Sequence, residues 1–187
     1  MRIAVIGAGN IGGTLGARWA DAGHEVVYGV RRPDGENQTS PAVAIDGADV
    51  VVLAVPGSAV GEILGSLGGG LDGKVVVDAT NNVGSGTLNA VGALPAGALP
   101  VRAFNTLGWE SFADPVVGGQ QASLFYAADE GTAKDVAEQL IRDVGLEPVW
   151  VGGIDKAEVV DSLTRLWFTL AFEQKLGRRL ALKLLRD

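Results

Sequence analysis

The stretch RIAVIGAGNIGGTLGARWA, residues 2–20, decides the fold of this chain. Its apolar run Ile3–Ile6 is typical of a strand, and an amphipathic helix is predicted to begin near Asn10. The glycines of the segment Gly7–Gly12 between them suit a tight turn, a close approach of a diphosphate to the backbone, and close packing of helix on strand. Unpaired N–H groups at the helix start favour anions. The stretch therefore predicts a dinucleotide-binding turn, and a purely structural glycine turn is the alternative.

Apolar strand-like runs alternate with helix-like segments along the rest of the chain. Several runs are continuous in β-branched residues, as in strands that are covered on both faces. The predicted strands are Ile3–Ile6, Val26–Tyr28, Val50–Val55, Val75–Asp78, Val101–Phe104, Ser123–Ala127 and Pro148–Val151. The predicted helices cover residues 10–22, 58–67, 86–93, 131–144 and 155–184. This order predicts an α/β fold: a doubly wound, mainly parallel sheet of Rossmann type with a short helical C-terminal extension.

Two features of this pattern carry further expectations. We expect residues 1–152 to form a dinucleotide-binding domain and residues 153–187 to form a C-terminal helical segment. Only 21 residues separate Tyr28 from Val50, and they include the turn-rich segment RRPDGENQTSP. Because that length allows one connection only, we predict a short helix over residues 41–46 and a missing or vestigial third strand.

The end of the second predicted strand bears on the choice of nicotinamide cofactor. NAD sites normally carry an acidic residue there, about 20 positions past the glycines, which binds the ribose 2′-hydroxyl. This chain has Arg31 and Arg32 at that place, and its first carboxylate after the strand is Asp34. Two guanidinium groups suit a 2′-phosphate, because they form charge-assisted, forked hydrogen bonds. The sequence therefore favours NADP(H) over NAD(H), with a solvent-exposed basic turn as the alternative.

Composition and charge exclude several classes of protein. The chain has no Cys and one His, which excludes thiolate zinc sites, iron–sulfur clusters, cysteine nucleophiles and most multi-histidine sites, so no metal is expected. The net charge is −7, and an acidic body repels phosphate backbones, so no nucleic-acid partner is expected. No apolar run approaches the ~20 residues of a bilayer span, and the N-terminus lacks the build of a signal peptide. These features predict a cytoplasmic protein without membrane contact.

Beyond the glycine turn, the chain resembles a known family, the NADP oxidoreductases that depend on coenzyme F420. The resemblance covers nearly the whole chain and rests on RIAVIGAGNIGGTLG, GVRR, ADVVVLAVP (48–56), VVVDATNNV (75–83), LPAGALPVRAFNTLG (94–108) and LFYAADEGTAKDVAEQLIRDVGLEPVWVG (124–152). It implies an NADP-binding Rossmann domain with a small helical C-terminus and exchange of hydride between NADP(H) and the deazaflavin F420. This chain departs from the family pattern in its shortened segment 33–48, in Arg102, where Lys is usual, and in its brief C-terminus.

The side chains available as proton donors bear on the reaction independently. Reduction of a simple ketone or imine usually needs an acid, commonly His, Lys or Tyr, beyond the carboxyl ends of the strands. We expect His24, Lys74 and Lys134 to lie away from that edge, whereas Lys156 or Lys175 can reach it from the last helix. The residues expected at the edge are poor general acids: Pro56, Thr80, Asn81, Asn82, Asn105, Thr106 and Trp109. We therefore assign no catalytic acid or base, and such a site suits a flavin or deazaflavin ring that needs only stacking and orientation.

The C-terminal segment is expected to complete the site. Apolar residues recur in it at helical spacing: Val159, Val160, Leu163, Leu166, Trp167 and Leu170. Residues 165–187 also carry six basic and two acidic side chains, which suit an anionic ligand, the acidic face of a second subunit or a solvated helix face. We expect the apolar stripe to pack on its own sheet and on a second copy, in a twofold homodimer that completes the pocket.

These features predict an NADPH-dependent oxidoreductase that transfers hydride between NADP(H) and a flavin-like acceptor, coenzyme F420 or a free flavin. The residues predicted to bind the dinucleotide are Gly7, Gly9, Asn10, Ile11, Gly12, Arg31, Arg32, Ala54, Val55, Pro56, Asn81 and Asn105. Within the same class, a reductase of a small imine or carbonyl compound is the alternative. Outside it, the alternative is a catalytically silent NADPH-binding sensor. The sequence leaves the acceptor, the direction of flux and the oligomeric state open.

Overall fold

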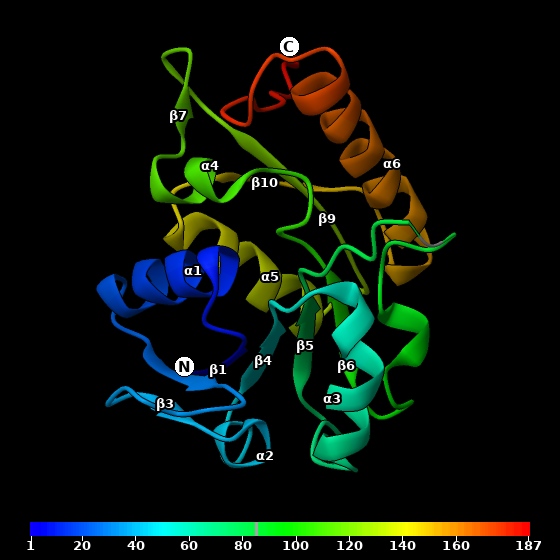
Figure 1. The fold of residues 1–187 in the computed structure, drawn as a ribbon. Helices are drawn as coiled ribbons and strands as arrows, with labels where there is room; N and C mark the ends of the chain where they lie inside the picture. The colour runs from blue at the N-terminus through cyan, green and yellow to red at the C-terminus, as the bar shows by residue number, and fades with distance from the viewer. Residues whose placement is uncertain (85) are drawn as a thin grey trace.

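A single eight-stranded sheet runs through the centre of the computed structural model, which describes residues 1–84 and 86–187 (Figure 1). Its strands are β1 (Arg2–Ile6), β2 (Glu25–Gly29), β3 (Gln38–Thr39), β4 (Val50–Leu53), β5 (Val75–Asp78), β6 (Leu99–Arg102), β9 (Ser123–Ala128) and β10 (Glu147–Trp150). They lie in the order β10-β9-β6-β5-β4-β1-β2-β3 and pair in parallel, except that β6 and β9 are antiparallel. A separate hairpin consists of β7 (Val116–Val117) and β8 (Gln120–Gln121). The predicted mainly parallel α/β sheet is confirmed.

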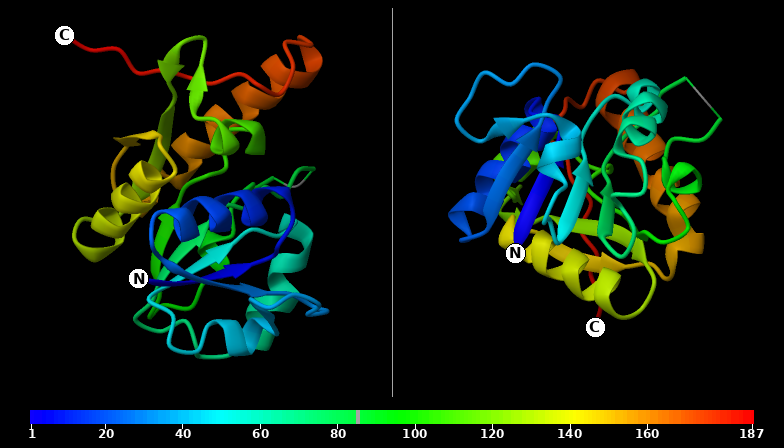
Figure 2. Two further views of the ribbon diagram at one scale, coloured as in Figure 1. Left: turned by 90° about the vertical axis from the view of Figure 1, so that its left-hand side faces the viewer. Right: turned by 90° about the horizontal axis from the view of Figure 1, so that it is seen from below.

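Helices cover both faces of this sheet (Figure 2). The α-helices are α1 (Asn10–Asp21), α2 (Pro41–Ala44), α3 (Val60–Leu67), α4 (Trp109–Ala113), α5 (Thr132–Asp143) and α6 (Ala157–Phe168). The shorter turns are η1 (Gly57–Ala59), η2 (Val91–Ala93), η3 (Ile154–Lys156) and the π-helical turn η4 (Thr169–Glu173), which extends α6. Helices α1 and α5 pack on one face of the sheet, and α2 and α3 pack on the other.

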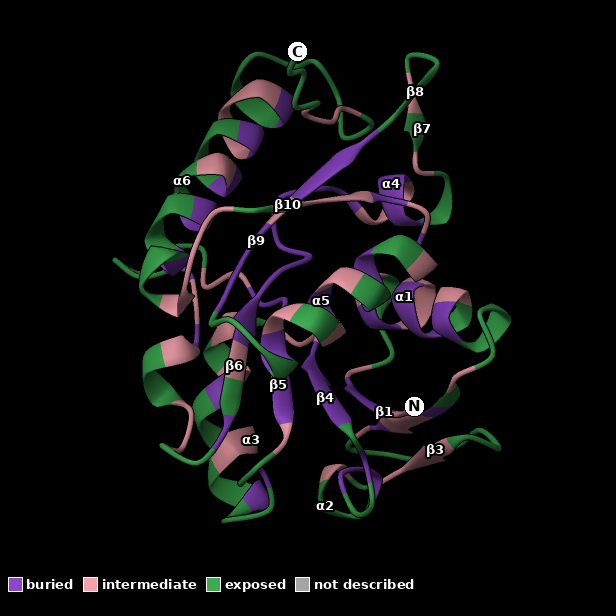
Figure 3. Cartoon of the chain, turned by 180° about the vertical axis from the view of Figure 1, so that it is seen from behind, coloured by how far each residue is buried: buried purple, intermediate pink, exposed green. Residues whose placement is uncertain are grey.

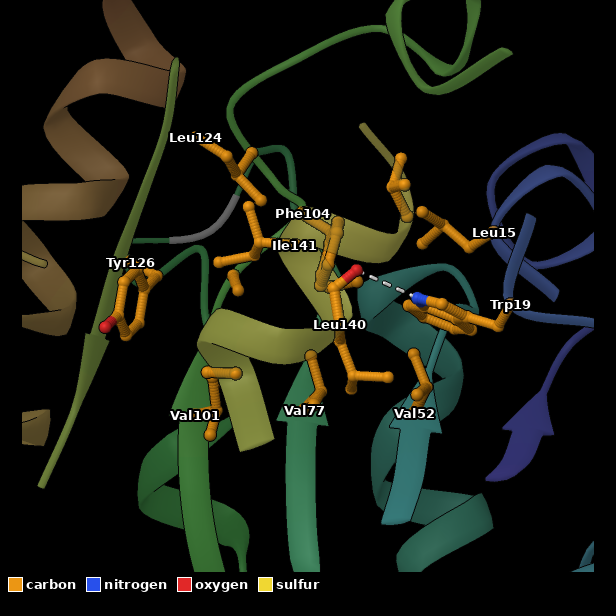
Figure 4. Packing of buried hydrophobic residues seen from close by; sticks show 14 of the residues in the cluster. Leu15, Trp19, Val52, Val77, Val101, Phe104, Leu124, Tyr126, Leu140 and Ile141 are labelled. Atoms are coloured by element: carbon orange, nitrogen blue, oxygen red, sulfur yellow. Dashed lines mark hydrogen bonds between the residues drawn. The ribbon is translucent and has the colours of Figure 1, made fainter. Parts of the chain in front are cut away.

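Two apolar clusters hold the helices on the sheet. In the cluster under α1 and α5, Trp19 packs edge-on against Phe104, with ring centroids 5.6 Å apart, and donates from Nε1 to the Leu140 carbonyl at 3.0 Å (Figure 4). The second cluster lies under α2 and α3 and includes Ala44 and Leu67. Strands β4 and β5 lie between the clusters and are buried throughout (Figure 3). Burial on both faces explains why these strands show no alternating pattern in the sequence.

The register of the parallel strands places five strand ends in one row. Across the sheet, Gly29 pairs with Ile6, Ile6 with Leu53, Leu53 with Asp78, and Asp78 with Arg102. The chain order also reverses here, because β1 has β2 on one side and β4 on the other. Ligands of open α/β sheets bind beyond the carboxyl ends of the strands at such a switch point. The loops that follow this row therefore form the edge at which the predicted site is expected.

The segment after β2 follows the prediction closely. Strand β3 has two residues, Gln38 and Thr39, which pair in parallel with Tyr28 and Gly29. Helix α2 covers Pro41–Ala44, within the short helix predicted over residues 41–46. The vestigial third strand is therefore confirmed, because turn-rich residues leave no length for a full strand and a crossover helix.

The helix predicted over residues 86–93 is wrong, because only the three-residue turn η2 forms there. Side chains bind the backbone of this segment in place of helical carbonyls. The Ala90 N–H donates to Asp78 Oδ2 at 2.6 Å, and the Val91 N–H donates to Asn89 Oδ1 at 3.1 Å. Such local side-chain bonds compete with helix formation.

The last helix is also shorter than the predicted range 155–184, because helical structure ends with η4 at Glu173. Lys175 and Gly177 have positive φ angles of 58° and 83°, which turn the chain out of the helix. Residues 174–187, called the C-terminal strap from here on, continue without helix or strand. The strap lies beside β9, where the Ser123 N–H donates to the Leu182 carbonyl at 3.0 Å.

Helix α6 corrects the predicted apolar stripe. Val160 and Trp167 point inward and are buried, whereas Val159 and Leu166 are 50% and 44% exposed. The inward face also carries Asp161, which is fully buried because it pairs with an arginine of β6. The predicted apolar stripe therefore contains residues from two faces of the helix, one buried and one exposed. Packing on the protein's own sheet is confirmed for the inward residues only.

The described part of the chain contains neither a candidate membrane span nor a candidate metal-binding cluster. No helix there has both the length and the apolar character that crossing a membrane requires. Residues 1–84 and 86–187 also hold no group of three or more His, Cys, Asp or Glu side chains placed to share a metal ion.

Candidate functional site

A groove of about 310 Å³ lies at the carboxyl ends of the central strands. It is lined by Gly9, Asn10, Ile11, Ala54, Val55, Pro56, Ala79, Asn81, Trp109 and Arg178. Seven of these ten residues are among those predicted to bind a dinucleotide. They come from the loops that follow β1, β4 and β5, because the strand register brings these loops to one edge. The predicted binding residues in the groove are up to 72 positions apart in the sequence, from Gly9 to Asn81, and the structure brings them together.

The three glycines of the turn after β1 have different surroundings. Gly7 has a φ of +104°, and a Cβ there would lie 2.5 Å from the Ala54 carbonyl oxygen. A Cβ on Gly12 would lie 1.9 Å from the Gly7 carbonyl oxygen, so these two glycines are needed for the close packing of strand and helix. A Cβ on Gly9 would meet nothing within 4 Å. Gly9 therefore leaves open space where the groove meets the start of α1, which fits a diphosphate on the backbone.

Arg31 and Arg32 lie just beyond the end of β2, one strand away from the glycine turn. Both side chains are exposed, and together they line a separate hollow of about 490 Å³. Among the described residues, Arg31 and Arg32 are the ones that line it, and neither carries a negative charge. This arrangement fits a 2′-phosphate.

The loop after β5 is ordered by Asp78. Its Oδ1 accepts from the Thr80 N–H at 3.0 Å and from the Thr80 hydroxyl at 2.7 Å, and its Oδ2 accepts from the Ala90 N–H. Asp78 is fully buried and does not line the groove. Asp78 therefore orders the loop by local hydrogen bonds.

Arg102, the last residue of β6, is a buried centre of hydrogen bonds that the sequence did not reveal. Its Nε donates to Asp161 Oδ1 at 2.8 Å, and its Nη1 donates to the Asp78 and Thr80 carbonyls at 3.1 and 2.6 Å. Its Nη2 donates to Asn81 Oδ1 at 3.1 Å and pairs with Asp161 Oδ1 at 2.7 Å. One guanidinium thus joins the loop after β5 to helix α6. The only signal in the sequence was the Arg in place of a family Lys.

Asn81 is oriented by this arrangement. Because its Oδ1 accepts from Arg102, its Nδ2 is the donor, and one Nδ2 proton goes to the Asn105 carbonyl at 3.1 Å. The second proton of Nδ2 has no partner in these bonds, and Asn81 lines the groove. The side chain therefore presents an N–H donor, which suits an oxygen of the nicotinamide carboxamide or ribose.

Asn105, also predicted as a binding residue, lies beneath the groove and is only 3% exposed. Its Nδ2 donates to the Thr164 hydroxyl at 2.7 Å, so the side chain points toward α6. The preceding Phe104 has a φ of +62°, an unfavourable angle for a large side chain, and its ring packs between Trp19 and Phe112. This strained turn fixes the Asn105 carbonyl that Asn81 uses, so Asn105 acts through Asn81.

The far end of the groove is formed by Trp109 and Arg178. Arg178, on the C-terminal strap, donates from Nε to Glu110 Oε1 at 2.7 Å and lies over the rings of Trp167 and Phe172. Burial opposes ionisation of Glu110, but the hydrogen bond and charge of Arg178 hold the pKa of Glu110 below its usual range. The sequence pointed to the basic run that contains Arg178, but not to this residue.

Comparison with known proteins shows which family the chain resembles. Residues 2–82 match the model of a family described as NADP oxidoreductase coenzyme F420-dependent. The F420-dependent NADP reductase of Methanothermobacter marburgensis is 28% identical to this chain over 215 residues, which span 94% of this chain and 95% of that protein. The chain therefore resembles this family, through its residues 2–82 and through a relative of nearly its own length. A glycerol-3-phosphate dehydrogenase of Paracoccus denitrificans is 30% identical over 156 residues, which span 75% of this chain and 50% of that enzyme.

Solved structures share the fold of this chain. A candidate F420-dependent NADP reductase from an Arthrobacter species superposes with a TM-score of 0.83 at 24% identity, and all of each chain is covered. A hypothetical protein of Sinorhizobium meliloti has a TM-score of 0.70 at 25% identity, covering 100% of this chain and 96% of that one. Both confirm the Rossmann-like arrangement.

None of the described residues that line the groove is a good general acid. His24 binds Asp143 Oδ2 at 2.8 Å, and Lys74 donates to the Ala48 carbonyl at 2.8 Å, both away from the groove. Lys156 pairs with its neighbour Asp155, so it does not enter the groove as the sequence allowed. The groove can position and stack a planar ring, but these side chains do not donate a proton to it.

Proposed function

We propose that this protein is an NADPH-dependent oxidoreductase that transfers hydride between NADP(H) and coenzyme F420. The observation that carries the proposal is the groove, where the glycine turn and Asn81 face Trp109 without a general acid among the described lining residues. The cofactor itself supplies the hydride chemistry, and the protein supplies binding and orientation. The match of residues 2–82 to the family model and the likeness to an F420-dependent NADP reductase support the same activity.

The N-terminal half of the groove would hold the adenine dinucleotide. Gly9 and Asn10 offer open backbone at the start of α1 for the diphosphate, while Gly7 and Gly12 keep that backbone close to β4. The hollow lined by Arg31 and Arg32 would take the 2′-phosphate. Charge-assisted bonds at that position make NADP(H) the preferred cofactor.

The nicotinamide end would lie between two loops. Ala54, Val55 and Pro56 line one side of the groove and offer an apolar wall. Asn81 lines the other side and offers its Nδ2 proton, with Asn105 holding it from below. Ile11 closes the space between the glycine turn and this end.

The acceptor would lie on the open side of the nicotinamide, against Trp109. A planar deazaflavin uses a stacking surface and hydrogen-bond donors, both of which the groove provides. A free flavin has the same requirements and remains a second acceptor to test. A small imine or carbonyl reductase is not favoured, because such a reaction calls for a proton donor that the described lining residues do not supply.

The C-terminal segment, residues 153–187, would complete the acceptor end of the site, since its strap brings Arg178 to the groove. A twofold homodimer is part of the proposal. The exposed Val159 and Leu166 on the outer face of α6 support it, because a second copy would bury them. Sedimentation of a Leu166→Glu variant as a monomer beside a dimeric wild type would support the dimer, and a monomeric wild type would overturn it. The cytoplasmic location stays a prediction.

Single-turnover kinetics tests the function. Protein loaded with NADPH is mixed in a stopped-flow instrument with F420, FMN, FAD, a quinone or a cyclic imine, and NADPH oxidation is followed by its absorbance. The proposal expects fast oxidation with F420 and slow or no oxidation with the imine. Tight NADPH binding without oxidation by any acceptor would contradict it and favour an NADPH sensor.

A further inference from the structure

Arg178 is the one formally charged side chain among the described residues that line the groove. It reaches the groove from the C-terminal strap, whereas the dinucleotide residues come from residues 7–81. Its backbone carbonyl also packs on the turn before α4, where a Cβ on Gly108 would lie 3.0 Å from it. The acceptor end of the groove therefore contains a cation whose position depends on the strap.

The guanidinium of Arg178 is held in one orientation. Its Nε and Nη2 face Glu110, at 2.7 and 3.5 Å from the two carboxylate oxygens. Its central carbon lies 5.9 Å from the Trp167 ring centre and 6.0 Å from that of Phe172. The π-helical turn η4 brings Phe172 beside Trp167, with ring centroids 5.7 Å apart. Two aromatic rings and one carboxylate thus fix a side chain that would otherwise be mobile.

Part of this guanidinium stays available to a ligand. The bonds to Glu110 use Nε and Nη2, and Nη1 makes no hydrogen bond within the described residues. The side chain is 45% exposed, so the free edge is reachable. Because Glu110 already balances the charge, the free edge acts as a forked hydrogen-bond donor more than as an isolated cation.

We propose that Arg178 selects the acceptor by binding the carbonyl-bearing edge of a planar heterocycle that stacks near Trp109. This inference rests on the proposed function and specifies its substrate class: rings with a pyrimidinedione edge, which flavins and deazaflavins share. A rigid guanidinium fork matches two neighbouring acceptors in the plane of a ring. Simple imines lack such an edge and would gain nothing from Arg178.

The position of Arg178 favours the ring edge over a phosphate of the acceptor side chain. The residue shares its groove with Ile11, Ala54 and Asn81, where the nicotinamide is expected, and a hydride acceptor must have its ring there. The diphosphate of a bound dinucleotide would be another anion near the groove, because Gly9 also lines it. These three possible partners of Arg178, namely the acceptor ring, the acceptor phosphate and the dinucleotide diphosphate, predict different effects of substituting Arg178 on binding.

Equilibrium binding measurements distinguish these three partners of Arg178 without relying on turnover. Full-length protein is saturated with NADP+, which has no hydride to give, and titrated calorimetrically with riboflavin, FMN or F420. The variants are Arg178→Gln, Arg178→Lys and, as a matched control, Arg179→Gln. Arg179 lies on the same strap but bonds Asp114 and the Val116 carbonyl, away from the groove. Thermal unfolding checks that each variant is folded.

We expect Arg178→Gln to weaken riboflavin, FMN and F420 alike, by about 10- to 100-fold, with NADP+ affinity unchanged. Arg178→Lys should bind nearly as weakly, because lysine has no planar fork, and Arg179→Gln should match the wild type. Weaker FMN with unchanged riboflavin would overturn the ring-edge assignment in favour of the phosphate. Weaker NADP+ would assign Arg178 to the diphosphate, and equal affinities in all variants would remove its role altogether.

The same titrations distinguish this inference from the proposed function. A wild type that binds flavins through Arg178 but oxidises no NADPH would contradict the function and keep the binding role. A wild type that turns over F420 at a rate and affinity unaffected by Arg178→Gln would contradict only the inference. A wild type that binds no ring at all in the presence of NADP+ would overturn both.

Discussion

The two ends of the groove are built in opposite ways. The proposed dinucleotide end consists of loops that directly follow neighbouring strands, and its shape comes from backbone and glycine. The proposed acceptor end consists of side chains from distant segments, such as Arg178 and Glu110, which lie 68 positions apart. The first end needs correct strand register, whereas the second needs specific ion pairs. This difference predicts that substitutions at the two ends will have different effects on stability and on ligand binding.

The largest expected effect comes from Arg102, which joins the loop after β5 to helix α6. Arg102→Ala would leave Asp161 and Asp78 buried without their cation, which typically costs about 3–5 kcal/mol of unfolding free energy. Urea unfolding measures this loss. Arg165→Ala is the control, since Arg165 makes a half-exposed ion pair with Glu158 at 3.6 Å and should lose about 1 kcal/mol or less. Similar small losses in both variants would contradict this stabilising role of Arg102.

The next largest effect concerns the dinucleotide end alone. Arg31→Ala should weaken NADPH binding by about 10- to 100-fold, because a charge-assisted bond to the 2′-phosphate is lost, and should leave NADH binding unchanged. Calorimetric titration with both cofactors measures the change. Lys183→Ala, which removes a strap cation that pairs with Glu147, should alter neither affinity. A wild type with equal affinity for NADPH and NADH would contradict the assignment of the arginines.

Gly9→Ala tests whether open backbone serves the ligand. A Cβ at Gly9 meets no atom of the protein within 4 Å, so the fold should tolerate it. A bound diphosphate would meet it, and NADPH affinity should fall about tenfold or more. Gly61→Ala is the control, because its Cβ also meets nothing within 4 Å but lies outside this groove. Unchanged NADPH affinity in Gly9→Ala, measured by calorimetry, would place the diphosphate elsewhere.

The smallest effect lies on the side of the sheet that carries β9 and α5. The hydrogen bond from the Tyr126 hydroxyl, followed by that from Arg142, lowers the pKa of Glu138 from 4.5 to about 2. Because the folded-state pKa is lowered, this stabilisation is present above pH 4.5 and is lost as the pH falls toward 2. Glu138→Gln should therefore unfold at lower urea than the wild type near neutral pH and approach it in acid. A difference that does not depend on pH would contradict this linkage.

Much of the dinucleotide end was predictable, because its signals are local. Gly7 to Gly12, the arginines after β2 and the loop Ala54–Pro56 follow their strands directly, so knowing the strands was enough to place them. Asn105 was predicted on the same reasoning, yet it is buried beneath the groove. The positive φ of Phe104 turns the chain between the strand and Asn105, and nothing in the sequence announces that turn.

The sequence alone determined the α/β fold, the glycine turn and the shortened third strand, because periodicity, turn residues and connection length act over a few neighbouring positions. Only the tertiary structure decided that α6 presents Asp161 inward to Arg102, and that the chain leaves the helix at Glu173 and carries Arg178 to the groove. Those outcomes depend on pairing charges from segments 59 and 68 positions apart. Burying a charged side chain is unfavourable unless an oppositely charged group lies next to it, and only the packed chain brings such distant groups together.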